Sequence, residues 1–364
     1  MTTSQPADGD GRDLLAAAGV LFTDERGRLL VVRVSYAAEH PVEIPGGGWE
    51  DADGSPRETA RREIEEELGI TPRLGPLACL DWSLDGDRPP IAAFLYWADP
   101  LTAAQLAAVR LEERELGWYG YLAPELAASA LPPLLSRRVT ACLRAPRSAG
   151  PLELEVGHPA GHTRAHLAPA PPAAYTGAAA LPGPGAAPRP APAPPMDRET
   201  YLATRPRIRA KARMLFTDPE GRILLVRLRP RAGDLGPYWV LPGGSVEADR
   251  ELPRQAARRE IREELGWECE VGRLLALDWV PAEADRPGDR ARLVHVYDGG
   301  TLAAGRLATA RLQPAELAEA RMFTPDGARE VLPGPSWARI AGALAARDGD
   351  GGPAELVQGV PAAP

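Results

Sequence analysis

The segment from Pro45-Gly46-Gly47 to Arg62-Glu63-Ile64-Glu65-Glu66-Glu67-Leu68-Gly69 occurs a second time, as Pro242-Gly243-Gly244 to Arg259-Glu260-Ile261-Arg262-Glu263-Glu264-Leu265-Gly266. The two copies keep the same register without a gap. In each copy an apolar strand sequence precedes the glycines. Ser55-Pro56 and Leu252-Pro253 then suit helix starts, because proline fits the first helical turn. A duplicated unit in a chain of 364 residues predicts two domains of ordinary size.

The predicted helix of each copy has an acidic face and an apolar face, since residues advance by about 100° along a helix. The acidic faces consist of Glu63, Glu66 and Glu67, and of Glu260, Glu263 and Glu264. The apolar faces consist of Ala60, Ile64 and Leu68, and of Ala257, Ile261 and Leu265. Crowded carboxylates repel one another, and oxygen ligands suit a hard divalent cation, Mg²⁺ or Mn²⁺. The sequence therefore predicts a metal site in each domain.

A solvated surface helix with salt bridges is the other interpretation of this pattern. Arg62 and Glu66, for example, have the helical spacing of a favourable ion pair. Two details favour the metal site. The glycines lie at the same distance upstream in both copies, and Glu65 is replaced by Arg262 while the three carboxylates of the acidic face recur.

These residues resemble the Nudix box, which is a glycine, five residues, a glutamate, seven residues, and then Arg-Glu-apolar-any-Glu-Glu-any-Gly. The Arg-Glu half fits in both copies, and the glycine half departs from the pattern. In the second copy Glu251 has the required place, but Ser245 occupies the glycine position. In the first copy Gly48 has the right place, but Gly54 stands where the glutamate belongs. The candidates to replace that glutamate are Asp51 and Asp53.

The resemblance implies an α/β protein with tandem Nudix folds, each an α/β/α sandwich with a mixed β-sheet. It also implies hydrolysis of a pyrophosphate bond in a nucleoside diphosphate linked to another moiety, with Mg²⁺ or Mn²⁺ as the cofactor. The charges of a pyrophosphate repel a water nucleophile, so a carboxylate-bound cation that neutralises them suits this chemistry. The expected partner is a small-molecule nucleoside diphosphate derivative.

The same resemblance assigns roles to individual residues. The metal ligands of the second copy are Glu260 and Glu264, with Glu263 alongside and the Gly243 carbonyl. Arg259 orients the glutamates, Glu251 braces the loop, and Glu260 or a hydroxide ion on the metal is the base. The matching residues of the first copy are Gly46, Arg62, Glu63, Glu66 and Glu67. A glutamate outside the box completes the metal site in many Nudix proteins, and the equivalent candidates here are Glu115 and Glu319.

Because Gly54 carries no carboxylate, we expect the first site to lack the brace and the second domain to be the stronger catalyst. The alternative function is a binding module, in which one or both domains sense a nucleotide or ADP-ribose without turnover. Gly54 favours this alternative for the first domain, and the second box disfavours it for the whole chain. An isomerase acting on an isoprenyl diphosphate is disfavoured, because no cysteine nucleophile is recognisable.

Composition and charge favour a soluble protein that acts on small molecules. The hydrophobic content is 44%, and the net charge of −8 provides no basic footprint for nucleic acid. Cys79, Cys142 and Cys269 lack disulfide or metal-ligand spacing, which favours a reducing cytoplasm. The sequence has no secretion signal and no apolar run long enough to cross a membrane. A monomer with an internal pseudo-dimer and a homodimer both remain open.

The predicted domains span 13–147 and 198–348. We expect a disordered tail over 1–12, a Pro/Ala-rich linker over 148–197 and a disordered tail over 349–364. Within the linker, the alternating sequence from Leu152 to Val156 predicts a short strand that belongs to the first domain.

Three features outside the box have two interpretations each. Trp82 and Trp279 are equivalent, and core packing is favoured over stacking on a nucleobase. The alternating basic residues from Arg205 to Arg213 are expected at a solvated strand edge rather than near a polyphosphate. Arg231 is expected to be solvated rather than bound to a phosphate.

Overall fold

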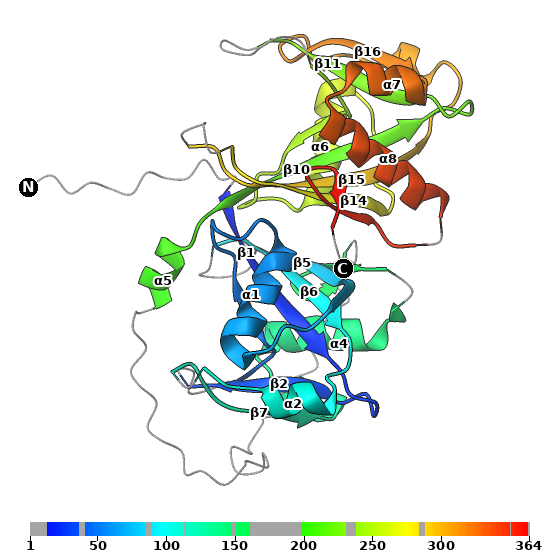
Figure 1. Ribbon diagram of the computed structural model, residues 1–364. Coiled ribbons are helices and arrows are strands. Elements are labelled where there is room, and N and C mark those ends of the chain that lie inside the picture. The colour runs from blue at the N-terminus through cyan, green and yellow to red at the C-terminus, as the bar shows by residue number, and fades with distance from the viewer. Residues whose placement is uncertain are drawn as a thin grey trace, which may run out of the picture. The chain divides into compact units, whose positions relative to one another are not determined.

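The computed structural model describes residues 13–35, 41–84, 89–112, 114–147, 150–160, 198–230, 238–283, 288–349 and 351–362 (Figure 1). The chain divides into two compact units, one of which takes in Leu15–Pro206 and the other Arg207–Ala363. We call them the first and the second domain. The predicted tail over 1–12 lies outside the described residues, as do Arg231 and residues 161–197 of the predicted linker.

The first domain contains a larger mixed sheet and a smaller antiparallel sheet. The larger sheet includes β1 (Asp13–Phe22), β4 (Gly46–Gly48), β5 (Leu74–Ser83) and β6 (Ile91–Ala98). Strand β1 pairs parallel with β6 and antiparallel with β4, while β5 pairs antiparallel with β6. The smaller sheet consists of β2 (Leu29–Val34), β3 (Val42–Glu43) and β7 (Leu116–Leu122). Strand β2 lies between the other two.

The second domain repeats these pairings. Its mixed sheet includes β10 (Ile208–Thr217), β13 (Gly243–Ser245), β14 (Leu274–Val280) and β15 (Arg292–Thr301). Strand β10 pairs parallel with β15 and antiparallel with β13, and β14 pairs antiparallel with β15. The antiparallel strands are β11 (Ile223–Leu228), β12 (Trp239–Val240) and β16 (Leu317–Phe323). Strand β11 pairs with both β12 and β16.

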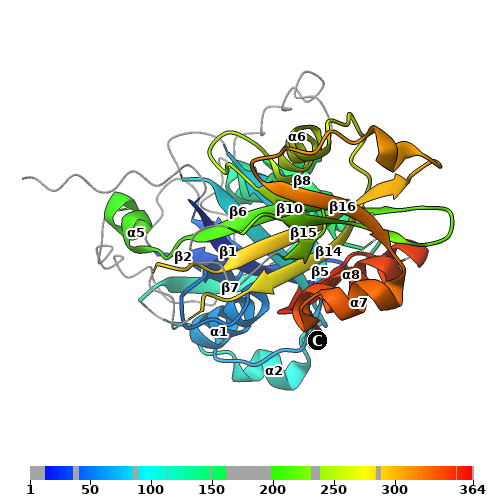
Figure 2. The same cartoon turned by 90° about the horizontal axis from the view of Figure 1, so that it is seen from above.

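Helices cover the sheets of each domain. The first domain has α1 (Pro56–Leu68), α2 (Ala103–Ala108), α3 (Pro124–Ala130) and α4 (Pro133–Arg144). A further helix, α5 (Arg198–Thr204), precedes the second domain in sequence. The second domain has α6 (Pro253–Leu265), the 3₁₀ helix η3 (Arg306–Thr309), α7 (Pro325–Val331) and α8 (Gly334–Asp348). Figure 2 shows α6 on one side of β10, β15 and β14, and α7 and α8 on the other. The predicted α/β architecture is confirmed.

The two box helices, α1 and α6, begin where the sequence predicts, and each ends at a glycine. Pro56 and Pro253 are their first residues, and Gly69 and Gly266 end them with φ of 65° and 70°. Glycine adopts this left-handed conformation at little cost. The apolar faces are fully buried, with 0% exposure for Ala60, Ile64, Leu68, Ala257, Ile261 and Leu265. Burying each leucine or isoleucine contributes roughly 1.5–3 kcal/mol, which fixes the rotation of the helix and the direction of its acidic residues.

A hairpin completes each domain. The hairpins are β8 (Leu152–Glu155) with β9 (His158–Pro159), and β17 (Ala354–Val357) with β18 (Val360–Pro361). Strand β8 pairs parallel with β5, and β17 pairs parallel with β14. The short strand predicted in the linker is therefore confirmed. The expectation of a disordered tail over 349–364 is wrong, since its described residues contain β17 and β18.

A buried aspartate anchors each hairpin. Asp81 is 0% exposed and accepts hydrogen bonds from Arg138 Nε at 2.6 Å and from the Gly157 N–H at 2.7 Å. The equivalent contacts of Asp278 are with Arg339 Nε at 2.7 Å and the Gly359 N–H at 3.0 Å. The sequence Leu-x-x-Gly-x-Pro-Ala occurs at 154–160 and again at 356–362. This repeat was the signal for the second hairpin, which the Gly, Pro and Ala content of the tail obscured.

Two further expectations concern the strands. Trp82 and Trp279 are 1% and 2% exposed, which confirms that they pack in the core. The basic stretch that ends at Arg213 does not lie at a strand edge as expected, because Lys211–Arg213 pair with β13 on one side and with β15 on the other. Among the described residues, no helix is both long and apolar enough to cross a membrane.

Candidate active site

The glycine turn of each domain lies directly against a glutamate of the box helix. Gly46 and Gly243 have φ of 145° and 125°, a conformation that favours glycine. A Cβ atom on Gly47 would collide with the Glu63 carboxylate, and one on Gly244 would collide with the Glu260 carboxylate. The paired glycines are therefore required both by the backbone conformation and by the close approach of a carboxylate.

A second glutamate of each helix binds the backbone of the turn. Glu67 Oε2 accepts a hydrogen bond from the Gly46 N–H at 2.9 Å, and Glu264 Oε2 accepts one from the Gly243 N–H at 2.7 Å. Both glutamates are buried, with exposures of 7% and 2%. Each domain thus places two predicted ligands at its turn, Glu63 with Glu67 and Glu260 with Glu264.

The third glutamate of each predicted face points outward. The side chains of Glu66 and Glu263 are 58% and 49% exposed. Glu66 Oε2 lies 2.9 Å from Arg62 Nη1, and Glu263 Oε2 lies 3.0 Å from Arg259 Nη1. The acidic face is therefore divided between two inner carboxylates at the turn and one outer carboxylate. The arginine Nη1 atom contacts the outer glutamate and also one inner glutamate, Glu63 or Glu260, at 3.0 Å in each domain.

The box arginine is braced in both domains. Arg259 donates from Nε and Nη2 to the Glu251 carboxylate at 3.0 and 2.7 Å, and from Nη2 to the Ser245 carbonyl at 3.0 Å. Arg62 donates from Nε and Nη2 to the Asp53 carboxylate at 2.9 and 3.0 Å, and from Nη2 to the Gly48 carbonyl at 2.9 Å. The expectation that the first site lacks a brace is wrong. Asp53 supplies the two oxygens one residue before Gly54.

Burial governs the ionisation of the inner carboxylates. Desolvation raises the pKa of Glu63 to about 7, and it raises the pKa of Glu67 to about 8. In the second domain desolvation raises the pKa of Glu260 and raises that of Glu264 to about 7. A nearby cation favours the charged form of such groups. A cation bound beside these carboxylates would therefore stabilise their ionised form.

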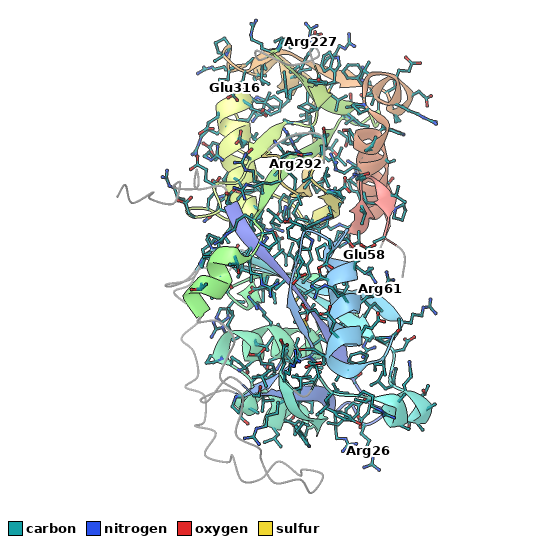
Figure 3. The ribbon with its side chains drawn as sticks, turned by 60° about the vertical axis from the view of Figure 1, so that its left-hand side comes forward. Arg26, Glu58, Arg61, Arg227, Arg292 and Glu316 are labelled. Atoms are coloured by element: carbon teal, nitrogen blue, oxygen red, sulfur yellow. The ribbon has the colours of Figure 1, made fainter. Side chains whose placement is uncertain are left out.

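Glutamates outside the box helix also raise the pKa of the inner carboxylates. The charges of Glu43 and Glu115 raise the pKa of Glu67 further, and the charge of Glu316 does so for Glu264. Ser35 N donates to the Glu115 carbonyl at 2.7 Å, and Arg229 N donates to the Glu316 carbonyl at the same distance. Glu316, which Figure 3 shows near one end of α6, is thus the equivalent of Glu115.

The predicted equivalence of Glu115 with Glu319 is therefore wrong. Glu319 lies on β16, opposite Arg227 in the strand register. Its carboxylate forms an ion pair with Arg227 Nη2 at 3.1 Å.

Arg213 is a residue of the second site that the sequence analysis did not identify as part of it. Its Nη1 atom donates to the Leu241 carbonyl at 3.1 Å and to the Gly243 carbonyl, the backbone oxygen predicted to bind the metal. The charges of Glu264 and Glu260 act on this guanidinium. Aligning the strand before each box would have marked this position as a difference between the domains, because Gly19 of the first domain corresponds to Arg213 of the second.

The donor atoms fit a hard divalent cation by type. Each turn collects carboxylate oxygens from two glutamates, and Mg²⁺ and Mn²⁺ prefer such oxygen ligands. Within the described part of the chain, however, no group of three or more His, Cys, Asp or Glu side chains is gathered closely enough to hold a metal ion. The paired inner glutamates of each domain are therefore the residues that fit a cation.

The fold and this arrangement define the class of protein. A model of the NUDIX domain matches residues 13–134 and 207–344, one region in each domain. The chain belongs to the NUDIX domain family and carries two such domains in tandem. This finding confirms the resemblance that the repeated box suggested.

Individual relatives resemble parts of the chain. It is 49% identical over 59 residues to the CTP pyrophosphohydrolase of Escherichia coli (strain K12), covering 16% of this chain and 42% of the relative. It is 36% identical over 52 residues to the 8-oxo-dGTP diphosphatase of Proteus vulgaris, covering 14% and 45%. The chain thus spans less than half the length of either relative. The MutT protein from Methanosarcina mazei Go1 is a similar solved structure, with 23% identity, a TM-score of 0.30, and coverage of 36% of this chain and 94% of that one.

Proposed function

We propose that this protein hydrolyses a pyrophosphate bond in a nucleoside diphosphate linked to another moiety, with Mg²⁺ or Mn²⁺ as its cofactor. The observation that carries the proposal is the duplicated pair of buried glutamates against a glycine turn. Family membership supports it, and the two curated relatives are named as a pyrophosphohydrolase and a diphosphatase. The free cysteines Cys79, Cys142 and Cys269 are consistent with a reducing cytoplasm as its location.

The residues of each site have distinct tasks in this proposal. Glu63 with Glu67, and Glu260 with Glu264, hold the cation, which neutralises phosphate charge and lowers the pKa of bound water. Arg62 and Arg259 hold the outer glutamates in place and are themselves fixed by Asp53 and Glu251. Because both ends of the guanidinium are held, the helix keeps one rotation relative to the turn. Glu260 and Glu63 accept the proton of the attacking water, since burial raises the pKa of both carboxyl groups and so makes them stronger bases than an exposed glutamate.

We further propose that the second domain is the stronger catalyst, as the sequence predicts, although the reason differs. Both domains have a brace, so the missing glutamate at Gly54 does not separate them. The pKa of Glu264 is raised to about 7 and that of Glu67 to about 8, so more of Glu264 is ionised at neutral pH. Arg213 also adds a fixed positive charge to the second site, where phosphate charge is stabilised during reaction.

Hydrolysis assays on the full chain test the proposal. The substrates are nucleotide sugars, dinucleoside polyphosphates, ADP-ribose and oxidised nucleoside triphosphates, each with Mg²⁺. We expect Glu260→Gln to remove most of the activity, Glu63→Gln to remove less, and the double variant to lower kcat on the order of 10²-fold or more. The exposed Glu65 on α1 provides the matched control, and Glu65→Gln should keep the wild-type rate.

Two other results would change the conclusion. A larger loss from Glu63→Gln than from Glu260→Gln would reverse the ranking of the domains and leave the hydrolase proposal standing. Tight binding of one of these nucleotides without cleavage by the wild-type protein would favour a nucleotide-sensing module, the alternative that the sequence left open.

A further inference from the structure

The two domains differ at one strand position that faces the glycine turn. Gly19 of β1 lies opposite Gly46 in the strand register, and Arg213 of β10 lies opposite Gly243. The flanking pairs also correspond, Ala18 with Gly47 and Ala212 with Gly244. The comparison of Gly19 with Arg213 therefore concerns equivalent backbone positions in two similar sites.

The side chain at this position decides what the carbonyl of the turn can bind. In the second domain the guanidinium of Arg213 donates to the Gly243 carbonyl. In the first domain Gly19 has no side chain, so no donor can reach the Gly46 carbonyl from this position. A carbonyl oxygen that already accepts from a cationic donor is a poorer ligand for a metal ion, because the two positive charges repel each other.

A second substitution changes the charge of the sites in the same direction. Glu43 lies opposite Val32 in the first domain, and Val240 lies opposite Val226 at the matching place in the second. The charge of Glu43 acts on Glu67. At these two strand positions the first site thus has a carboxylate, Glu43, and no arginine, and the second has Arg213 and no carboxylate. Arg205, whose charge acts on Glu63, lies elsewhere in the first domain.

We propose that Arg213 acts as a built-in cation of the second domain, which therefore takes up divalent metal more weakly than the first. The guanidinium occupies the Gly243 carbonyl and balances part of the charge of Glu260 and Glu264. The first domain has Gly19 at this position, so its turn carbonyl receives no such donor, although the charges of Arg62 and Arg205 act on Glu63. The inference rests on the proposed function, since it assumes that both turns are sites for a divalent cation.

Metal titration of the full chain without substrate tests this inference. Binding of Mn²⁺ is measured from the loss of the free-ion signal in electron paramagnetic resonance and by calorimetry. Glu63→Gln with Glu67→Gln leaves only the second site, and Glu260→Gln with Glu264→Gln leaves only the first. We expect the second site to bind Mn²⁺ roughly tenfold more weakly or worse, because a fixed positive charge lies beside it.

Replacement of Arg213 should remove this difference. In the background that leaves the second site, Arg213→Met is expected to strengthen Mn²⁺ binding by roughly tenfold, whereas Arg213→Lys keeps the charge and the weak binding. Arg258 is the matched control, because it is an exposed arginine on α6, and Arg258→Met removes the same charge from the same domain. If Arg213→Met lowers the melting temperature too far for titration, Glu43→Val in the first site provides the second test, and we expect it to weaken binding there.

The outcomes separate the inference from the proposed function. Equal affinities of the two sites for Mn²⁺, or no gain in affinity from Arg213→Met, would overturn the role of Arg213. No loss of affinity from Glu43→Val would overturn the role of the charge difference. Cation-dependent hydrolysis would stand in each case. Equal gains from Arg213→Met and Arg258→Met would show a general charge effect and overturn the inference. Folded protein that takes up no Mn²⁺ at either site would overturn the proposed function itself.

Discussion

The two domains share the geometry of their box helices and differ in the charge around them. Glu63 and Glu260 lie against equivalent glycines, and Glu67 and Glu264 accept hydrogen bonds from equivalent N–H groups. Arg62 and Arg259 are each held by a carboxylate and a backbone carbonyl. The first domain adds Glu43 beside this arrangement, and the second adds Arg213. The comparison teaches that backbone geometry is the conserved part of the duplication, while side chains projecting from neighbouring strands set the electrostatics of each site.

The largest expected effect concerns a feature that the domains share, the buried aspartate on β5 or β14 that anchors the hairpin at the end of each domain. Asp81→Ala and Asp278→Ala leave Arg138 and Arg339 without their carboxylate partners. Breaking a buried pair in this way costs roughly 3–5 kcal/mol. We expect each change to destabilise its own domain, and hydrogen exchange followed peptide by peptide measures this. Exchange should rise in 152–159 for the first variant and in 354–361 for the second.

The exposed Asp326 serves as the control for these variants, and Asp326→Ala should leave exchange in both hairpins unchanged. Strong destabilisation of one domain alone would break the comparison, since it would show that the equivalent contacts do not have equivalent energetic weight.

The parts of this structure that were predictable are those that depend on local sequence. The helix starts followed from Pro56 and Pro253, and the buried face followed from the spacing of Ile64 and Leu68, because both depend on backbone preferences and periodicity within one element. Arg213 was harder to predict, and Asp53 could be named only as one of two candidates, beside Asp51. Their roles depend on how a loop and a neighbouring strand meet the helix, and the box pattern contains no information about that meeting.

The carboxylate that holds the box arginine in each domain gives the next largest effect. Asp53→Asn and Glu251→Gln keep the volume but remove the charge that holds Arg62 and Arg259. Hydrogen bonds between charged groups contribute about 1.5–3 kcal/mol, so we expect kcat of the affected domain to fall by roughly tenfold or more. Rates are measured in the full chain with the other domain silenced by Glu63→Gln or Glu260→Gln.

Asp51 provides the control for the brace, because it is exposed and close in sequence to Asp53. Asp51→Asn should leave the rate of the first domain unchanged. If Asp51→Asn lowers kcat of the first domain as much as Asp53→Asn does, Asp53 is not the functional counterpart of Glu251. The expectation that the first site lacks a brace would then be correct.

The smallest effect is a difference in ionisation between the two buried glutamates that bind the turn. In metal-free protein the pKa is raised to about 8 for Glu67 and to about 7 for Glu264, with burial as the main cause in both. The neighbouring Glu43 and Glu115 raise the first value further, whereas Arg213 lowers the second. A difference of about one unit corresponds to about 1.4 kcal/mol. Carbon-13 NMR of the glutamate carboxyl groups, with chelator present, measures the two midpoints directly.

The sign of the effect on stability follows from these values. Between the unfolded pKa of 4.5 and the raised folded pKa, the folded protein binds more protons than the unfolded protein, so stability falls as pH rises. The decline contributed by Glu264 should end near pH 7 and that contributed by Glu67 near pH 8. Glu67→Gln should therefore remove the part of the decline between pH 7 and 8, and Glu264→Gln should leave that part in place. If the Glu67 midpoint lies at or below that of Glu264, the additional carboxylate and the arginine do not set the electrostatic difference between the domains.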